Sequence, residues 1–409
     1  MKYNSKILLI VISTILLFLI LSCTYFEVMK KLKSGTPVFG KEISVIPIKL
    51  KGHRIYVKVK INDNQKEYNF ILDTGALTMI DKQIAKELDL EKGAKIPGGK
   101  GAHLVKTKMI FILGDMKVKD FIVPMFDLPE ASGSDPQIDG FIGSDFLRFF
   151  RVTIDYKQKR IVLAHKTDSL NIANDAYKIE IKKPLPIRFP LTEFIIDNKI
   201  ETEGMIDTGS PFALVFPLSL IEKQDFSNGR PLIKANGIMA KWPFTSSNDN
   251  YLARIKSFKM GKLEIKNIPV IYAELPKNVS YPLLGKKFLS QFLITIDYPE
   301  NEMIFVPYED TEFKNNLFST GLRLVKEKND KIIVQGFWEG SPVDKSDIKL
   351  NDEILEINSK ITKDLSLREI NNILNDDTIK DIELLIKNSE GEKIVFLKKE
   401  LLFPEINDL

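Results

Sequence analysis

Phe70-Ile71-Leu72-Asp73-Thr74-Gly75 is the stretch that decides the fold of this chain, because its ending recurs 134 residues later in Met205-Ile206-Asp207-Thr208-Gly209. In both copies an apolar run, of the kind that forms a buried strand, leads directly into an Asp-Thr-Gly triplet. Isolated ionised carboxylates are costly to bury unless they are paired. Two of them in matched settings therefore predict a pair of carboxylates that meet in the folded chain.

A second repeated element follows each triplet. Residues 143–156 align without gaps with residues 285–298, at an offset of 142, and 8 of these 14 positions are identical. Two copies at such a long period predict two homologous lobes, whereas a solenoid stacks at least three shorter repeats. We therefore expect lobe 1 at residues 41–166 and lobe 2 at residues 167–308.

The order of these motifs resembles that of the retropepsin-like aspartic peptidases, in the bacterial form with two lobes in one chain. Asp73-Thr74-Gly75-Ala76-Leu77-Thr78 is similar to the retroviral-type active-site motif, and Asp207-Thr208-Gly209-Ser210 to the wider aspartic-peptidase motif. Phe141-Ile142-Gly143 and Leu283-Leu284-Gly285 resemble the element that packs behind the catalytic loop in that family. The resemblance implies a mainly β fold of two tandem acid-protease lobes, related by a pseudo-twofold axis, with the active site complete in a monomer.

The predicted catalytic residues are Asp73 and Asp207. Two neighbouring carboxylates cannot both ionise, so one stays protonated while the other acts as a base. The ionised member would take a proton from a water molecule, and the protonated member would polarise the scissile carbonyl. The two roles are interchangeable at this stage. Gly75 and Gly209 are expected to allow a tight turn that brings backbone N–H groups near each carboxylate.

Four hydroxyl-bearing residues are expected to support the active-site loops. The resemblance implies that Thr74 and Thr208 hydrogen-bond across the pseudo-twofold axis and lock the two loops together. Thr78 and Ser210 are expected to hydrogen-bond the adjacent aspartate.

A peptidase of this kind also needs a cover over its substrate. Gly98, Gly99 and Gly101 lie in a glycine-rich stretch that is typical of a mobile hairpin tip, and they are our flap candidates for lobe 1. Asn236 and Gly237 occupy the matching place in lobe 2. Glycines in such a stretch can also be plain turn formers.

The pattern changes near residue 310. Gly340-Ser341-Pro342-Val343, followed by Asn351-Asp352-Glu353-Ile354, resembles the motifs of a PDZ domain, although Asn351 replaces the usual glycine. We therefore expect a small α+β PDZ domain at residues 310–402. Its peptide would add as a strand at the edge of a sheet.

The peptide groove of this PDZ domain is expected between a strand and a helix. Gly321, Leu322, Arg323 and Leu324 are the candidates for the carboxylate-binding loop and first strand. Ser366-Leu367-Arg368-Glu369 is a capping box, which predicts the start of a helix. That helix would place Leu367, Ile370, Ile373 and Leu374 on one stripe along the wall of the groove.

The N-terminus has the features of a targeting segment. Lysines precede an apolar run over residues 7–21, which is the length of a signal-peptide core. The run is followed by Ser22 and Cys23, the only cysteine, in a context that resembles a bacterial lipoprotein box. We expect a signal segment at residues 1–22, lipidation at Cys23, a tether at residues 23–40, and an exported, membrane-anchored protein, periplasmic or at the cell surface. An uncleaved membrane anchor and a conventionally cleaved signal remain alternatives.

Composition excludes several function classes. The chain has 409 residues, of which 44% are apolar and 28% charged, with a net charge of +4. Interspersed charges give no nucleic-acid footprint. A single cysteine excludes disulfides within the chain and thiol catalysis, and three scattered histidines predict no metal site. No cofactor is predicted.

The leading interpretation is an aspartic endopeptidase that acts on peptides or proteins and carries a PDZ domain for substrate recognition or regulation. One alternative is a non-catalytic, membrane-anchored peptide-binding protein that keeps the fold. In another, the PDZ domain is an adaptor and the lobes serve as its scaffold.

Overall fold

The computed structural model describes residues 25–62, 64–96, 101–128, 138–165, 176–182, 189–223, 231–242, 245–276, 279–309, 317–327 and 329–403. The predictions for the signal segment, Cys23, Gly98 and Gly99 lie outside these residues. The fold is mainly β, as expected, with 51% of residues in strands and 12% in helices. No helix in the described part of the chain is long and apolar enough to cross a membrane.

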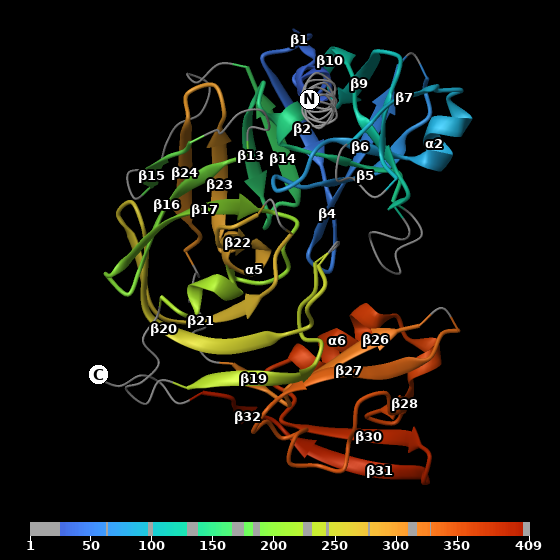
Figure 1. The fold of residues 1–409 in the computed structure, drawn as a ribbon, viewed down its shortest axis with the longest axis vertical. Helices are drawn as coiled ribbons and strands as arrows, with labels where there is room; N and C mark the ends of the chain where they lie inside the picture. Colours follow the sequence, from blue (N-terminus) through green and yellow to red (C-terminus); the bar gives the residue numbers. More distant parts are fainter. Residues whose placement is uncertain are drawn as a thin grey trace, which may run out of the picture.

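The first unit (residues 25–165) is built on an eleven-stranded sheet, shown in blue and cyan in Figure 1. Its strands are β1 (Thr36–Phe39), β3 (Lys49–Lys51), β4 (Arg54–Ile61), β5 (Tyr68–Leu72), β6 (Met79–Asp81), β7 (Lys92–Lys95), β8 (His103–Val105), β9 (Met109–Leu113), β10 (Met116–Phe121), β11 (Pro124–Phe126) and β12 (Gly140–Ile142). The helices are α2 (Lys82–Glu87) and α4 (Ser144–Leu147). Asp81 caps α2 by accepting a hydrogen bond from the backbone N–H of Gln83.

The second unit (residues 176–309) repeats this strand arrangement around its own triplet. Its strands are β16 (Leu191–Ile196), β17 (Ile200–Asp207), β18 (Leu214–Pro217), β19 (Leu232–Gly237), β20 (Asn250–Met260), β21 (Leu263–Ala273) and β22 (Leu283–Gly285). Helix α5 (Lys286–Leu289) follows β22, and η2 (Leu218–Leu220) is a single 3₁₀ turn after β18. The apolar-apolar-Gly strand runs parallel to the strand that ends in the triplet in both units, β12 beside β5 and β22 beside β17.

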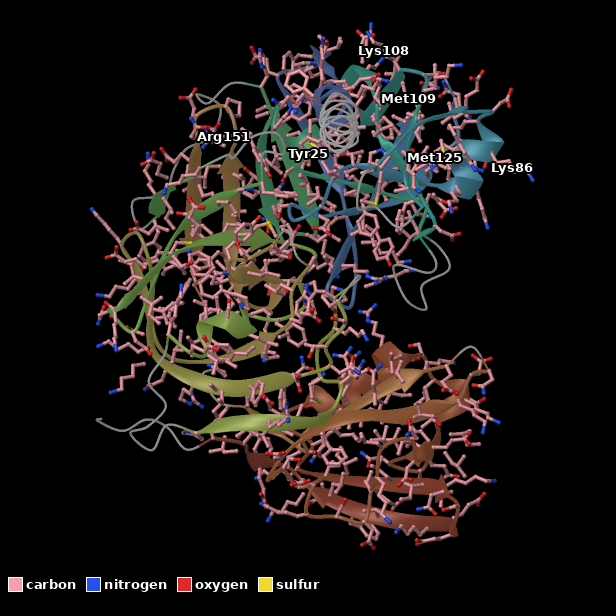
Figure 2. The ribbon with its side chains drawn as sticks, in the orientation of Figure 1. Tyr25, Lys86, Lys108, Met109, Met125 and Arg151 are labelled. Atoms are coloured by element: carbon pink, nitrogen blue, oxygen red, sulfur yellow. The ribbon has the colours of Figure 1, made fainter. Side chains whose placement is uncertain are left out.

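A six-stranded sheet joins the two units. Its order is β15 (Tyr177–Glu180), β24 (Glu302–Pro307), β23 (Phe292–Asp297), β13 (Arg151–Asp155), β14 (Arg160–Ala164) and β2 (Ile43–Pro47). Thr153 of β13 lies opposite Thr295 of β23, and their hydroxyl oxygens are 2.8 Å apart. These threonines hold equivalent places in the sequence repeat, so the two repeats meet at this strand pair. Arg151, labelled in Figure 2, crosses this junction to the carboxylate of Asp297 at 3.7 Å.

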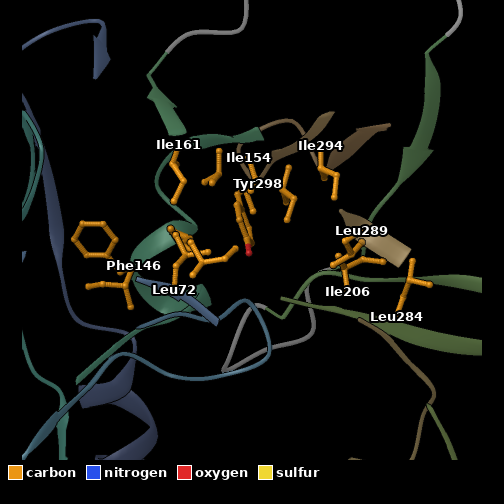
Figure 3. Packing of buried hydrophobic residues seen from close by; sticks show 14 of the residues in the cluster. Leu72, Phe146, Ile154, Ile161, Ile206, Leu284, Leu289, Ile294 and Tyr298 are labelled. Carbon is orange, nitrogen blue, oxygen red and sulfur yellow. The ribbon is translucent and has the colours of Figure 1, made fainter. Parts of the chain in front are cut away.

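One apolar cluster runs through both units. Figure 3 shows Leu72 and Phe146 of the first unit and Ile206 and Leu289 of the second packed on either side of Tyr298. Burial of aromatic and aliphatic side chains at this scale is the main contribution that holds such layers together. The two triplets therefore project from a shared core.

The segment expected to be a tether, residues 23–40, is largely part of the first unit. Val28 and Leu32 are buried in the common core, and β1 pairs with β10. The backbone N–H of Ile122 also donates to the hydroxyl of Ser34. The expected tether was therefore wrong for residues 28–39. Val28 and Leu32 pack into the core, and β1 pairs with β10 at the edge of the sheet, so this segment belongs to the first unit.

The C-terminal unit (residues 317–403) has its own set of strands, with one helix across them (Figure 1, orange and red). Its elements are β25 (Phe318–Ser319), β26 (Leu322–Lys326), β27 (Ile332–Trp338), β28 (Glu353–Ile357), β29 (Lys360–Ile361), η3 (Thr362–Asp364), α6 (Leu367–Asn375), β30 (Asp381–Asn388), β31 (Gly391–Lys398) and β32 (Glu400–Leu401). The capping box of Ser366 and Glu369 is confirmed at the start of α6. The predicted apolar stripe is also confirmed, because Ile370 and Leu374 are buried in the core of this unit.

Strand pairing links the C-terminal unit to the second unit. β19 pairs with β27, with Asn236 opposite Phe337 and Gly237 opposite Gly336. The backbone N–H of Ile238 donates to the carbonyl of Gln335 at 2.9 Å, which extends the pairing by one residue. The sheet of the second unit is thereby continuous with that of the C-terminal unit.

We predict that Gly336→Ala weakens this joint. An added Cβ would lie 2.7 Å from the backbone N and O of Ile238, too close for the strands to keep their spacing. Hydrogen–deuterium exchange should show faster exchange of the amides at residues 235–238. Gly40→Ala is the control, because its Cβ would meet only Asp115 O at 3.4 Å. Unchanged protection in Gly336→Ala would show that the β19–β27 pairing does not hold the units together.

Candidate active site

Parallel strand pairs deliver the two aspartates to the same place. Asp73 follows β5, and its backbone N–H donates to the carbonyl of Ile142 in β12 at 2.9 Å. Asp207 ends β17, opposite Gly285 at the end of β22. Each apolar run buries its strand and leaves the carboxyl group at the strand end. Asp207 is only 7% exposed, whereas Asp73 is less deeply buried.

Crossed hydrogen bonds join the two loops. The backbone N–H of Thr74 donates to Thr208 Oγ1, and the N–H of Thr208 donates to Thr74 Oγ1, both at 3.0 Å. The hydroxyl of Thr74 donates to the carbonyl of Ile206 at 2.6 Å, and that of Thr208 to the carbonyl of Leu72 at 3.3 Å. The pattern is symmetric, and all of these groups are buried. Each loop therefore satisfies the polar groups of the other.

The glycines let each loop approach the opposite carboxyl group. A Cβ at Gly75 would lie 2.7 Å from Cγ of Asp207, and one at Gly209 would lie 2.3 Å from Oδ2 of Asp73. Their backbone N–H groups donate to the aspartate of their own loop at 2.9 Å, from Gly75 to Asp73 and from Gly209 to Asp207. Any side chain at either glycine would force the two aspartates apart.

The electrostatics favour one proton shared by the pair. Burial raises the pKa of Asp73, against the hydrogen bonds it accepts. Burial also raises the pKa of Asp207 well above its ordinary range, and the negative charge of Asp73 raises it further. The interaction between the two carboxyl groups lowers the pKa of Asp73 and raises that of Asp207. Both directions favour the retention of one proton by the pair.

Thr78 supports the first loop, but not through Asp73 as we expected. Its N–H and its hydroxyl both donate to Oδ1 of Asp145 at 2.7 Å, and its oxygen accepts from the N–H of Gly143. Thr78 faces away from the carboxyl group of Asp73 because the turn directs it toward Asp145 in α4. Sequence reasoning missed Asp145, although it lies two residues after Gly143 within the repeated segment.

The second loop has a different support. The backbone N–H of Ser210 donates to Asp207 at 3.1 Å, but its hydroxyl has no partner among the described residues, so the expected side-chain bond is absent. In the first unit Ser144 Oγ bridges the carbonyl of Thr74 and the hydroxyl of Tyr298. Its equivalent in the second unit is Lys286, whose side chain instead reaches the first unit.

The flap candidates have different surroundings. Gly101 has a φ of +78°, which is consistent with a turn. Asn236 and Gly237 lie inside β19 and are paired with the C-terminal unit, and Gly237 also has a positive φ of +79°. In the second unit the expected flap is therefore a strand within a larger sheet, because β27 pairs with β19 along Asn236 and Gly237.

The candidate groove residues lie around β26 and α6. Gly321 precedes β26 with a φ of +81°, and its Cβ would lie 2.3 Å from Cβ of Ser341, so only glycine fits there. Leu324 is buried, while Leu322 and Leu367 are half-buried against the same core. Among the described strands β26 pairs only with β27, which leaves its other edge toward α6.

No group of three or more potential ligands that could hold a metal ion occurs within the residues the structure describes. The side chains gathered at the triplets are carboxyl and hydroxyl groups with backbone amides around them. That set of groups can move protons and orient a water molecule without further ligands.

Comparison with known proteins agrees with this geometry for one part of the chain. Residues 57–146 match the family described as aspartyl protease. The matched stretch runs from β4 to α4 and contains Asp73, Thr78 and Asp145, but it ends before Asp207. No curated protein is significantly similar to the chain. The chain thus contains an aspartyl-protease-like domain, and the place of Asp207 rests on the geometry above.

We predict that Thr74→Val destabilises the protein by about 2–4 kcal/mol, because the N–H of Thr208 and the carbonyl of Ile206 lose their buried partners. Thr74→Ser should retain most of the stability. The measurement is the free energy of unfolding in urea. Thr192→Val is the control, since it removes one buried hydrogen bond to Glu180 outside the site. Equal losses in both valine variants would contradict a special role for the crossed bonds.

A second prediction concerns Asp145. Burial raises the pKa of Asp145 from 3.8 to about 6, so the folded protein keeps a proton that the unfolded chain releases. The folded state therefore loses about 3 kcal/mol of stability as the pH rises from about 4 to about 6. Asp145→Asn keeps the acceptor oxygen and removes this titration. Its stability relative to the unmodified protein should rise over that pH range, and parallel profiles would refute the assignment.

Proposed function

We propose that this protein is an aspartic endopeptidase whose first and second units are the two lobes of one active site. The observation that carries the proposal is the contact of the two Asp-Thr-Gly loops, held by the crossed threonine bonds and closed by two glycines. A structural role alone does not require two facing acids, because a buried pair of carboxyl groups lowers stability. The family match over residues 57–146 supports the same activity.

In the proposed reaction a water molecule attacks the scissile carbonyl carbon. The ionised carboxylate takes a proton from that water, while the protonated acid donates a hydrogen bond to the carbonyl oxygen. Burial and the charge of Asp73 favour Asp207 as the resting proton donor. When the tetrahedral intermediate collapses, a proton passes to the leaving nitrogen and the pair returns to its starting state.

The C-terminal unit is proposed to be a PDZ domain that binds a peptide between β26 and α6. The edge of β26 beside the capped helix supports this assignment. We also propose that Cys23 is lipidated and holds the protein at a membrane, on the sequence pattern alone. In this arrangement the peptidase would act on exported peptides or proteins.

The test is cleavage of a diverse peptide library by the purified protein from pH 3 to 8. Asp73→Asn and Asp207→Asn should each lower kcat/KM by at least about a thousandfold, because each removes one member of the acid–base pair. Circular dichroism should show that both variants are folded. Asp120→Asn is the matched control, since Asp120 is an exposed carboxylate paired with Lys108. Full activity in either dyad variant would rule out the proposed mechanism.

A further inference from the structure

Cationic side chains gather beside the catalytic loops. The turn between β3 and β4 consists of Gly52 and His53, and Arg54 begins β4. The ammonium group of Lys286 in the second unit donates to the carbonyl of Gly52 in that turn at 2.9 Å. The neighbour of Arg54 in β4 is Ile55, which lies opposite Leu72 of β5. Arg54 is therefore at the level of Asp73, and its positive charge acts on that carboxyl group.

The C-terminal unit adds two arginines to the same place. Arg323 of β26 donates to Gln335 at 2.9 Å and to the carbonyl of Met239 in the second unit, so its guanidinium group is held at the joint between units. Arg368 is exposed in the first turn of α6. In Figure 1 the lower end of β4 points toward α6. We call His53, Arg54, Lys286, Arg323 and Arg368 the cationic junction.

The charges in the cationic junction act on one another. Burial lowers the pKa of His53 to about 4, and the positive charges of Arg54, Lys286 and Arg323 lower it further. Burial also lowers the pKa of Lys286, with a contribution from Arg368. The neighbouring charges that act on these two groups are thus all positive. An anion placed among them would relieve this repulsion.

We propose that the cationic junction is a subsite for a carboxylate of the peptide substrate. The carboxylate would come from an Asp or Glu near the cleaved bond or from the terminal α-carboxyl group. Two features support this ligand: the junction extends from Arg54, at the level of Asp73, to Arg323 on the groove strand β26, and arginine offers paired donors that match a carboxylate. The inference rests on the proposed function, because it assigns selectivity to that site.

The subsite predicts selectivity for charge rather than for shape. A peptide with Glu at the position that reaches the junction should be cleaved about five- to tenfold more efficiently than its Gln counterpart, which is the size of a charge-assisted contact at a partly buried site. This preference should shrink as the salt concentration rises, because mobile ions screen partly exposed charges.

The experiment uses the full-length protein and matched sets of peptides that contain one cleaved sequence. One arm replaces Glu by Gln, one position at a time, on both sides of the bond. The second arm compares a free C-terminal acid with the C-terminal amide. A preference in the first arm identifies a side-chain carboxylate, and a preference in the second identifies the chain terminus. Both results support the subsite.

Variants connect the selectivity to the junction. Arg368→Gln should reduce the acid preference about threefold without affecting the fold, because Arg368 is exposed. Arg323→Gln should reduce it further. Lys398→Gln is the matched control, an exposed cation on β31 at the far edge of the C-terminal sheet, and it should leave the preference unchanged. Equal kcat/KM values for every acid and its neutral partner would overturn the inference.

Binding separates this inference from the proposed function. Fluorescence anisotropy with the Asp73→Asn protein measures the affinity for the same labelled peptides without cleavage. Tighter binding of the acidic peptides, lost in Arg368→Gln, would support the subsite even if the unmodified protein cleaves no peptide. Cleavage without any acid preference in rate or affinity would retain the peptidase and reject the subsite.

Discussion

The crossed hydrogen bonds between Thr74 and Thr208 are the constraint on which the site depends. Each threonine offers its hydroxyl to the backbone of the other loop, so neither loop has its buried polar groups satisfied alone. The six-stranded sheet and the shared apolar core hold the two units close enough for these bonds to form. With the loops fixed, the two glycines bring the carboxyl groups together, and burial then makes it unfavourable for both to ionise. Loop geometry and burial together thus favour one proton shared by the pair.

The two loops are equivalent at their tips and different behind them. Asp145 and Ser144 anchor the first loop, whereas Lys286 of the second unit extends to the turn between β3 and β4. Lys286 stands in the second repeat where the first has Ser144. The second loop therefore lacks the hydroxyl that anchors the first, and has instead a cation at the contact between units. The C-terminal unit reaches this region through Arg323 and through the pairing of β19 with β27. Duplication of the loop accounts for the acid pair, and divergence behind the loops accounts for the cationic junction beside it.

The sequence predicted the parts that depend on local pattern. The triplets, the mainly β fold, and the capped helix after Ser366 could all be read from residue order and apolar periodicity. It could not predict contacts set by the packing of distant segments. Thr78 hydrogen-bonds Asp145 rather than Asp73 because α4 packs behind the loop. β19 is paired along its edge because the C-terminal unit supplies β27 as a partner strand. Residues 28–39 pack against the first unit for the same reason. The sequence of a short strand does not show which distant sheet edge it will pair with.

The central claim is that Asp73 and Asp207 act as one pair on a peptide. A crystal structure with a statine-type peptide, whose hydroxyl mimics the tetrahedral intermediate, tests this most directly. The account predicts one bound mimic per chain, with its hydroxyl within hydrogen-bonding distance of both carboxyl groups. A mimic bound elsewhere, or a hydroxyl in contact with only one aspartate while the other is turned away, would contradict it.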